Sequence, residues 1–256
     1  MDNPEAMDNE VGLETPPPEP QPEVFWGYTD LCLFVFFFML GLLAGNVLLK
    51  IEAGVFHFAK APVAASLSAL IVAYAVLFGG LRTMFRMQYD RPFWSSLGWR
   101  PVPVAAPYVA AAGAFTAAAA ILAGGLIHLP QKQNQMTEFL QEGNLAILLM
   151  AIYGVAIAPL CEELAFRGFL QPLLARSFGA PAGISMAGVA FGLLHFQEYG
   201  NSWRHALLLS GAGACFGWVR HATRSTKASV IMHASYNGLL FVLLAVAMIA
   251  ERNQHH

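Results

Sequence analysis

The amino-acid sequence predicts an all-α protein, a polytopic transmembrane bundle of about seven or eight helices. Of its 256 residues, 57% are hydrophobic and only 12% are charged, whereas a soluble domain has roughly 25% charged residues. The apolar residues form long runs rather than the alternating pattern of a transmembrane β-barrel. The formal net charge of -2 gives no basic patch, so we expect no nucleic-acid partner.

Apolar runs, most of them close to the roughly 20 residues that a helix needs to cross a bilayer, define the expected helices. These runs cover residues 27–49, 63–85, 103–129, 144–172, 181–198, 203–220 and 228–250. The polar segment near 86–102 contains arginines together with Trp94 and Trp99, a combination typical of the membrane interface. The fourth run contains Pro159, which we expect to kink or open its helix.

Three regions follow from this pattern. Residues 1–26 are acidic and proline-rich, and we expect them to form a disordered tail because they have too little apolar surface to fold. Residues 27–143 form the amino-terminal transmembrane helices and the interfacial segment. Residues 144–250 contain the adjacent acids Glu162 and Glu163 and two histidines inside apolar runs, so we expect a catalytic intramembrane domain there.

The distribution of lysine and arginine favours a cytoplasmic amino terminus. In that orientation the basic residues expected on the inner side are Arg82, Arg86, Arg91, Arg100, Arg167, Arg176, Arg220, Arg224 and Lys227. Those expected on the outer side are Lys50, Lys60, Lys132, Arg204 and Arg252. Because cytoplasmic loops carry the excess of positive charge, we expect a multi-pass integral membrane protein with its amino terminus inside, in the plasma (inner) membrane if the source is bacterial.

The fourth run contains two adjacent acids and an arginine, Glu162, Glu163 and Arg167. Each such group at membrane depth costs roughly 2.5–3.5 kcal/mol, so these residues usually mark function. Glu163 and Arg167 are four residues apart and can pair on one helix face. Glu162 points about 100° away from Glu163, so we expect it to face a cavity as an acid or base. The alternative is a purely structural charged cluster that pins helix ends.

Two later runs add His195, His233 and Asn237. His233 and Asn237 are one turn apart on the same face. Taken singly, a histidine on an apolar face is commonly a hydrogen-bonded core residue, and a His/Asn pair can simply join helices. Taken together with Glu162, these side chains can meet in one cavity if the three helices pack against each other. Hydrolysis there requires water, and we expect the cavity to open to the cytosol.

Two chemistries fit these residues. In the first, Glu162 and His195 activate a water for attack on an amide carbonyl, and His233 and Asn237 donate hydrogen bonds to the oxyanion. In the second, Glu162, His195 and His233 hold a divalent metal such as zinc, although no H-E-x-x-H motif is present. The cofactor is therefore either absent or a metal. Cys161 is a less favoured thiol nucleophile, because isolated cysteines in apolar runs are usually small core residues.

The combination of Glu162-Glu163-x-x-x-Arg167, Phe191-x-x-x-His195 and His233-x-x-x-Asn237 resembles the three motifs of the CAAX protease and bacteriocin-processing family. This family includes the type II CAAX prenyl endopeptidases, also called the abortive-infection family, and the resemblance extends over about 144–242. The segment from Phe93 to Trp99 also resembles an interfacial stretch of bacterial members.

The resemblance implies an intramembrane endopeptidase that cleaves near the membrane surface. It also implies that Glu162 is the catalytic glutamate, that His195 shares water activation, and that His233 and Asn237 bind the oxyanion. Glu163, Arg167 and Phe191 are then supporting positions. The family is often described as metalloproteases, but a metal-free glutamate mechanism is also proposed for it.

The expected partners are a peptide or protein substrate, prenylated or unmodified, and membrane lipid. One alternative function is a non-catalytic immunity or scaffold protein that binds peptides in the same cavity. Another is a transporter that uses the same buried groups, which is disfavoured by the lack of paired, broken helices in matching halves.

Overall fold

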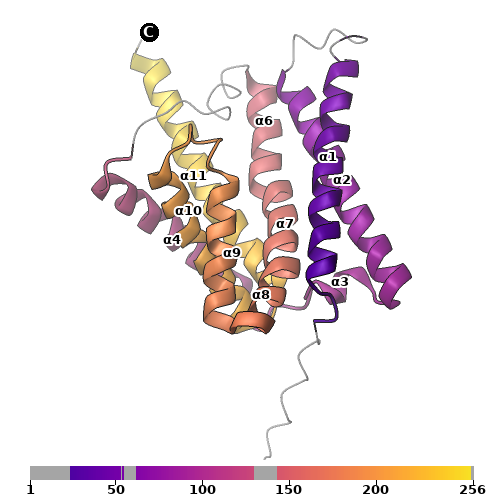
Figure 1. Cartoon of the computed structure of the whole chain (residues 1–256). Helices are drawn as coiled ribbons and strands as arrows, with labels where there is room; N and C mark the ends of the chain where they lie inside the picture. Colours follow the sequence, from indigo (N-terminus) through magenta and orange to yellow (C-terminus); the bar gives the residue numbers. More distant parts are fainter. Residues whose placement is uncertain (1–23, 53, 55–61, 130–142, 255–256) are drawn as a thin grey trace, which may run out of the picture.

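The computed structural model describes residues 24–52, 54, 62–129 and 143–254, and in these residues it is all-helical with no strand (Figure 1). The predicted all-α bundle is therefore confirmed. Most of the predicted acidic tail (residues 1–23), residues 130–142 at the end of the amino-terminal region and the two terminal histidines lie outside the described residues.

The helices are α1 (Tyr28–Ile51), α2 (Pro62–Tyr89), α3 (Phe93–Ser96), α4 (Ala106–Leu126), α6 (Asn144–Ile152), η4 (Tyr153–Ile157), α7 (Ala158–Glu163), η5 (Leu164–Leu170), α8 (Gln171–Phe178), α9 (Ala180–Leu194), α10 (Trp203–Thr223) and α11 (Thr226–Gln254). Within the described residues, five helical segments are long and apolar enough to cross a membrane. Those segments are Tyr28–Ile51, Val63–Tyr89, Ala106–Leu126, Asn144–Phe178 and Thr226–Ala247. The chain is an integral membrane protein.

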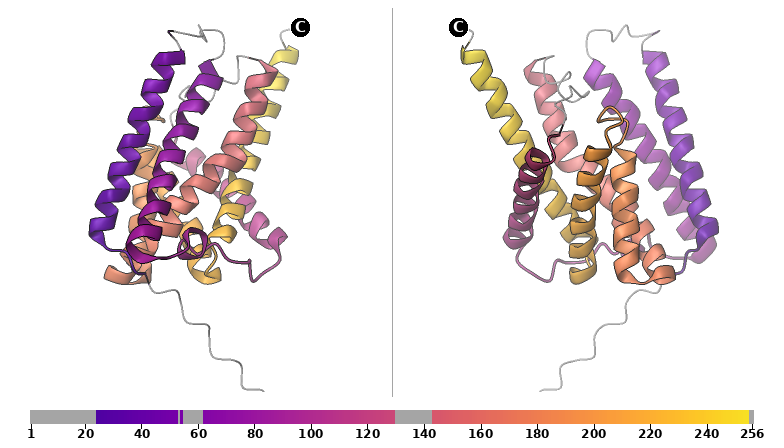
Figure 2. Two further views of the ribbon diagram at one scale, coloured as in Figure 1. Left: turned by 90° about the vertical axis from the view of Figure 1, so that its right-hand side faces the viewer. Right: turned by 60° about the vertical axis from the view of Figure 1, so that its left-hand side comes forward.

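The helices pack in pairs around the segment that runs from α6 to α8. α1 lies along α2, α9 along α10, and α4 along α11. Figures 1 and 2 show the α1–α2 pair on one side of α6–α8 and the α9–α10 hairpin on another, with α11 crossing behind. This arrangement brings α7, α9, α10 and α11 together near the middle of the bundle.

The segment from α6 to α8 is one continuous helical path with two π-helical turns, η4 and η5, on either side of α7. Pro159 lies in the first turn of α7, two residues after the end of η4. Because proline lacks an N–H and its ring crowds the preceding turn, the helix widens to π geometry just before it. Such π turns frequently occur at functional sites, and here they flank the two adjacent glutamates.

The folded part of the chain begins earlier than the sequence predicted. We assigned residues up to 26 to the tail, but Trp26 is only 2% exposed and stacks on Phe169 at a centroid distance of 5.5 Å. Its indole N–H also donates a hydrogen bond to the Phe169 carbonyl. Phe25 packs edge-on against Phe85. The predicted boundary at residue 26 is too late because composition does not reveal tertiary packing. Two large aromatic residues at the end of the predicted tail bury enough apolar surface to order that end.

Helix ends also differ from the predicted runs. The fifth run was expected to reach residue 198, but α9 ends at Leu194, and His195 already has non-helical dihedral angles. The fourth run was expected to end at 172, but helix continues to Phe178. The run at 103–129 is shortened to Ala106–Leu126. α2 extends to Tyr89, where the tyrosine hydroxyl donates to Asp30 at the start of α1.

Two glycines let α1 approach α2 closely. A Cβ atom added at Gly41 would lie 2.5 Å from the Ala73 carbonyl oxygen, and one at Gly45 would lie 2.6 Å from the Ala69 carbonyl oxygen. Small residues four apart on both helices thus face each other, which is the usual way in which membrane helices bring their backbones together.

We predict that Gly41→Leu destabilises the protein, because the new side chain collides with the α2 backbone. Overpacking of this kind costs about 1–3 kcal/mol or more, so the apparent melting temperature of the purified protein in detergent should fall. Gly125→Leu is the matched control, since a Cβ at Gly125 meets nothing within 4 Å. Equal melting temperatures for the two variants would contradict the close α1–α2 packing.

Candidate active site

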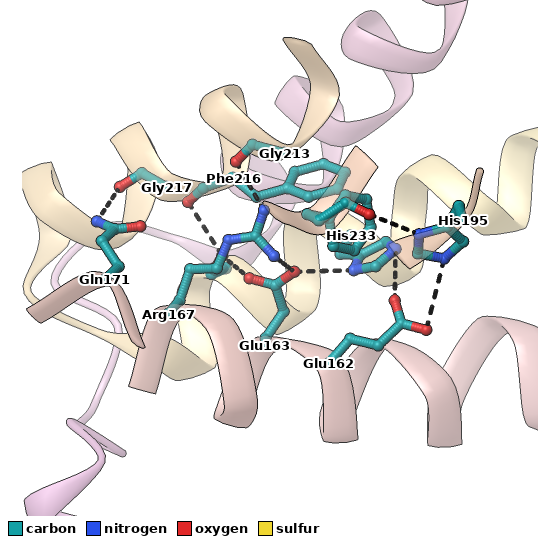
Figure 3. A network of polar contacts seen from close by, with 11 residues as sticks. Glu162, Glu163, Arg167, Gln171, His195, Gly213, Phe216, Gly217 and His233 are labelled. Carbon is teal, nitrogen blue, oxygen red and sulfur yellow. Dashed lines mark hydrogen bonds and ion pairs between the residues drawn. The ribbon is translucent and has the colours of Figure 1, made fainter. Parts of the chain in front are cut away.

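A buried ion pair between Glu163 and Arg167 lies at the centre of the bundle (Figure 3). Both side chains are 0% exposed, and one guanidinium nitrogen lies 2.8 Å from Glu163 Oε1. The pairing expected from their four-residue spacing is therefore present. The Glu163 carboxylate also accepts hydrogen bonds from the Ser229 hydroxyl and from His233 Nδ1, the latter at 2.9 Å. Three donors thus compensate the buried negative charge.

Arg167 joins α9 and α10 to this network through a backbone carbonyl and two aromatic rings. Its second terminal nitrogen donates to the Gly213 carbonyl at 2.7 Å. The guanidinium carbon lies 4.8 Å from the Phe191 ring centroid and 5.5 Å from that of Phe216. Cation–π contacts and a carbonyl acceptor make a buried cation tolerable. One turn further along, the Gln171 amide donates to the Gly217 carbonyl, which extends the same seam (Figure 3).

Glu162 points away from this ion pair and toward two imidazoles. Its Oε1 lies 3.9 Å from His195 Nε2, and its Oε2 lies 3.8 Å from His233 Nε2. The Glu162 and His195 side chains keep 14% and 17% of their surface exposed, whereas His233 keeps 3%. These separations exceed direct hydrogen-bond length, so the Glu162 carboxylate faces the two Nε2 atoms without being hydrogen-bonded to either of them.

The second nitrogen of each imidazole is engaged elsewhere, which fixes its orientation. His195 Nδ1 lies 2.9 Å from the Phe191 carbonyl, an acceptor, so Nδ1 carries a proton. His233 Nδ1 likewise donates to the Glu163 carboxylate. In the neutral form both histidines therefore present the Nε2 lone pair to Glu162. Phe191 separates and supports the two rings, at centroid distances of 4.7 Å from His195 and 5.6 Å from His233.

Asn237 lies one turn beyond His233 on α11 and reaches the π turn of the neighbouring segment. Its amide nitrogen donates to the Gly154 carbonyl at 2.7 Å. An amide group has two N–H hydrogens, so this contact orients Asn237 and leaves its second hydrogen for another acceptor. The π turn η4 is thus tied directly to the helix that carries His233 and Asn237.

The structure adds three residues that sequence reasoning missed: Ser229, Phe216 and Gln171. Ser229 precedes His233 by one turn, and Gln171 follows Arg167 by one turn, so helical spacing alone could have found both. Phe216 stacks on His233 at 4.5 Å. No polar pattern in the sequence distinguishes Phe216 from other core aromatics.

Neither the thiol nor the metal alternative gains support from the described residues. Cys161 is buried on another flank of α7, where it lines a pocket with Phe78 and Trp94 rather than contacting a histidine. Glu162, His195 and His233 do approach each other, but the part of the chain that the structure describes contains no group of three His, Cys, Asp or Glu side chains arranged to hold a metal ion. We therefore derive no step that uses a metal.

Comparison with known proteins gives one match. No curated protein and no solved structure matches the chain. Residues 144–239 match the model of a family described as type II CAAX prenyl endopeptidase Rce1-like. The matched segment begins at α6 and ends within α11, and so it contains each of the three motifs quoted above. The predicted resemblance is thereby confirmed, and the region that builds the candidate site is similar to the Rce1-like type II CAAX prenyl endopeptidases.

Proposed function

We propose that this protein is an intramembrane endopeptidase in which Glu162 activates a water molecule for attack on a peptide bond. The observation that carries the proposal is the position of the Glu162 carboxylate between the Nε2 atoms of His195 and His233, at 3.9 and 3.8 Å. A water in this space meets one carboxylate and two imidazoles at once. The similarity of residues 144–239 to an endopeptidase family agrees with this chemistry.

The hydrolytic step can be written with these side chains alone. The water transfers a proton to the Glu162 carboxylate while its oxygen attacks the carbonyl carbon, and the Nε2 lone pair of His195 accepts the water's second hydrogen as a hydrogen bond. The carbonyl π electrons move to oxygen and form the oxyanion. When the C–N bond breaks, Glu162 returns its proton to the leaving nitrogen, and the products are an amine and a carboxylic acid, which then releases its remaining proton to solvent.

The oxyanion is held by His233 and Asn237. When His233 carries both protons, Nδ1–H donates to Glu163 and Nε2–H is directed toward the cavity, where it can donate to the oxyanion. Asn237 contributes the amide hydrogen that Gly154 does not use. Donors of this kind contribute roughly 10²–10³-fold in rate each when they are preorganised, and both side chains are already oriented by a second hydrogen bond.

The proposed substrate is a peptide or protein terminus that enters from the membrane, with a CAAX-type prenylated terminus as the first class to test. The proposed orientation has the amino terminus in the cytoplasm. Support for it comes from basic residues beside the first described residues: Arg176 donates to the Val24 carbonyl, and Arg91 lies over the Phe25 ring at 5.7 Å. The plasma (inner) membrane is the proposed location for a bacterial source.

We predict that Glu162→Gln abolishes cleavage without unfolding the protein. An amide cannot accept the proton of the attacking water, so the rate should fall by at least about 10²–10⁴-fold. The measurement is turnover of an internally quenched peptide in detergent, in prenylated and unmodified forms. Retention of wild-type turnover by the variant would overturn the proposal. Unchanged biological effect of the inactive variant in cells would instead favour the immunity or scaffold function.

Glu163→Gln is the matched neighbour, and we predict that it acts on stability. The substitution removes the carboxylate that pairs with Arg167, and so it leaves an uncompensated buried cation, which typically costs about 3–5 kcal/mol. Its melting temperature should therefore drop well below that of Glu162→Gln. Identical melting temperatures for the two variants would show that the ion pair does not support the fold in this way.

We further predict that chelators leave cleavage unchanged within about twofold, because the route uses no metal-bound water. Purified enzyme is treated with EDTA and with 1,10-phenanthroline, each followed by an assay with and without added Zn²⁺. Loss of activity that zinc restores would refute the metal-free route while leaving the peptidase function in place.

A further inference from the structure

A cavity that is not lined by Glu162, His195 or His233 lies between α2, α3, α7 and the start of η5. Its volume is about 310 Å³, at the lower end of the range of roughly 300–1,000 Å³ typical of ligand sites. Most of its wall is apolar, formed by Phe78, Gly79, Phe93, Leu160, Cys161 and Leu164. Three of these lining residues, Leu160, Cys161 and Leu164, lie within two residues of Glu162 in the sequence, but they face α2 and α3 instead of the histidines. The cavity therefore belongs to a different flank of α7.

Arg82 and Trp94 complete the lining and give the cavity a polar end. Arg82 is exposed, and among the described residues it forms no ion pair or hydrogen bond. It lies seven residues before the end of α2 at Tyr89, about 10 Å along the helix at 1.5 Å per residue. Tyr89, Trp94 and Trp99 near this end are the aromatic residues typical of a membrane interface. The Arg82 guanidinium is therefore free to bind an anionic group from outside the described fold, near the membrane interface.

We propose that this cavity binds an anionic phospholipid, with one acyl chain against Leu160 and Leu164 and the phosphate at Arg82. The charge and its position favour this occupant, since an arginine guanidinium suits a phosphate group geometrically. The same end of the bundle carries Arg86, Arg91 and Arg176, so it faces the leaflet in which anionic lipids are enriched if positive residues lie inside. The part of the cavity beside Gly79 is open to an acyl chain, because a Cβ atom added at Gly79 would meet nothing within 4 Å.

The lipid site is independent of the proposed peptidase activity. Its lining comes from α2, α3 and the segment from Leu160 to Leu164, whereas Glu162 faces His195, which follows α9, and His233 of α11. A prenylated substrate held here would have its apolar chain on the wrong flank of α7 for attack by Glu162-bound water. Binding can therefore be measured in Glu162→Gln protein, and its result stands whether or not the peptidase proposal is correct.

The test is native mass spectrometry of the full-length detergent-purified protein with phosphatidylglycerol and with phosphatidylcholine of the same acyl chains. We expect tighter binding of phosphatidylglycerol. Arg82→Gln should weaken phosphatidylglycerol binding about fivefold, from roughly 1 kcal/mol per arginine near an anionic lipid surface, and leave phosphatidylcholine binding unchanged. Gly79→Leu should weaken binding of both lipids, because the added side chain fills the cavity.

Two matched controls and a competitor make the outcomes decisive. Arg86→Gln, one turn further along α2 and already near Asp90, and Gly125→Leu on α4 should bind both lipids like the unaltered protein. If Arg82→Gln and Arg86→Gln weakened phosphatidylglycerol binding equally, the effect would come from general surface charge, and the proposed lipid site would be wrong. Full binding by Gly79→Leu would also overturn it, as would displacement of the lipid by a prenylated peptide, which would assign the cavity to the substrate.

Discussion

The buried ion pair between Glu163 and Arg167 is the interaction on which the rest of the site depends. Two charges without solvent contact are costly inside a bilayer, so the pair is tolerated only because its remaining donors and acceptors are largely satisfied. Those partners come from two other helices, through His233 on α11 and the Gly213 carbonyl on α10. The requirement to satisfy one ion pair therefore fixes how three helices meet, and it sets the orientation of one imidazole in the cleft.

Helical geometry gives the adjacent residues Glu162 and Glu163 different environments. Neighbouring residues on a helix point about 100° apart, so Glu163 can be fully enclosed while Glu162 keeps 14% of its side-chain surface exposed. α7, the short α-helical segment that carries both, is flanked by the π turns η4 and η5. Anchoring Glu163 thereby positions Glu162, although within the described part of the chain the Glu162 carboxylate has no direct hydrogen bond.

Local patterns in the sequence were sufficient to predict contacts within one helix. The Glu163–Arg167 pair follows from four-residue spacing, and the seven apolar runs correspond to the observed helical segments. Contacts between helices were not predictable in the same way. The bond from Asn237 to the Gly154 carbonyl depends on how α11 crosses η4, and the order of Trp26 depends on the distant Phe169. Helix crossing angles are set by packing of small residues such as Gly41 and Gly213, whose partners the sequence does not name.

The short length of α9 determines both where His195 lies and how close water comes to it. α9 has 15 residues and spans about 22 Å, less than the roughly 30 Å of a hydrocarbon core. A helix that starts near one interface, where α8 ends, must then end inside the membrane thickness. His195 directly follows its last residue, Leu194, and the backbone from His195 to Asn201 is a series of turns with exposed Gln197 and Glu198. Polar, non-helical backbone at such depth requires protein or water around it, so the same short helix that presents His195 to Glu162 also brings solvent close to both.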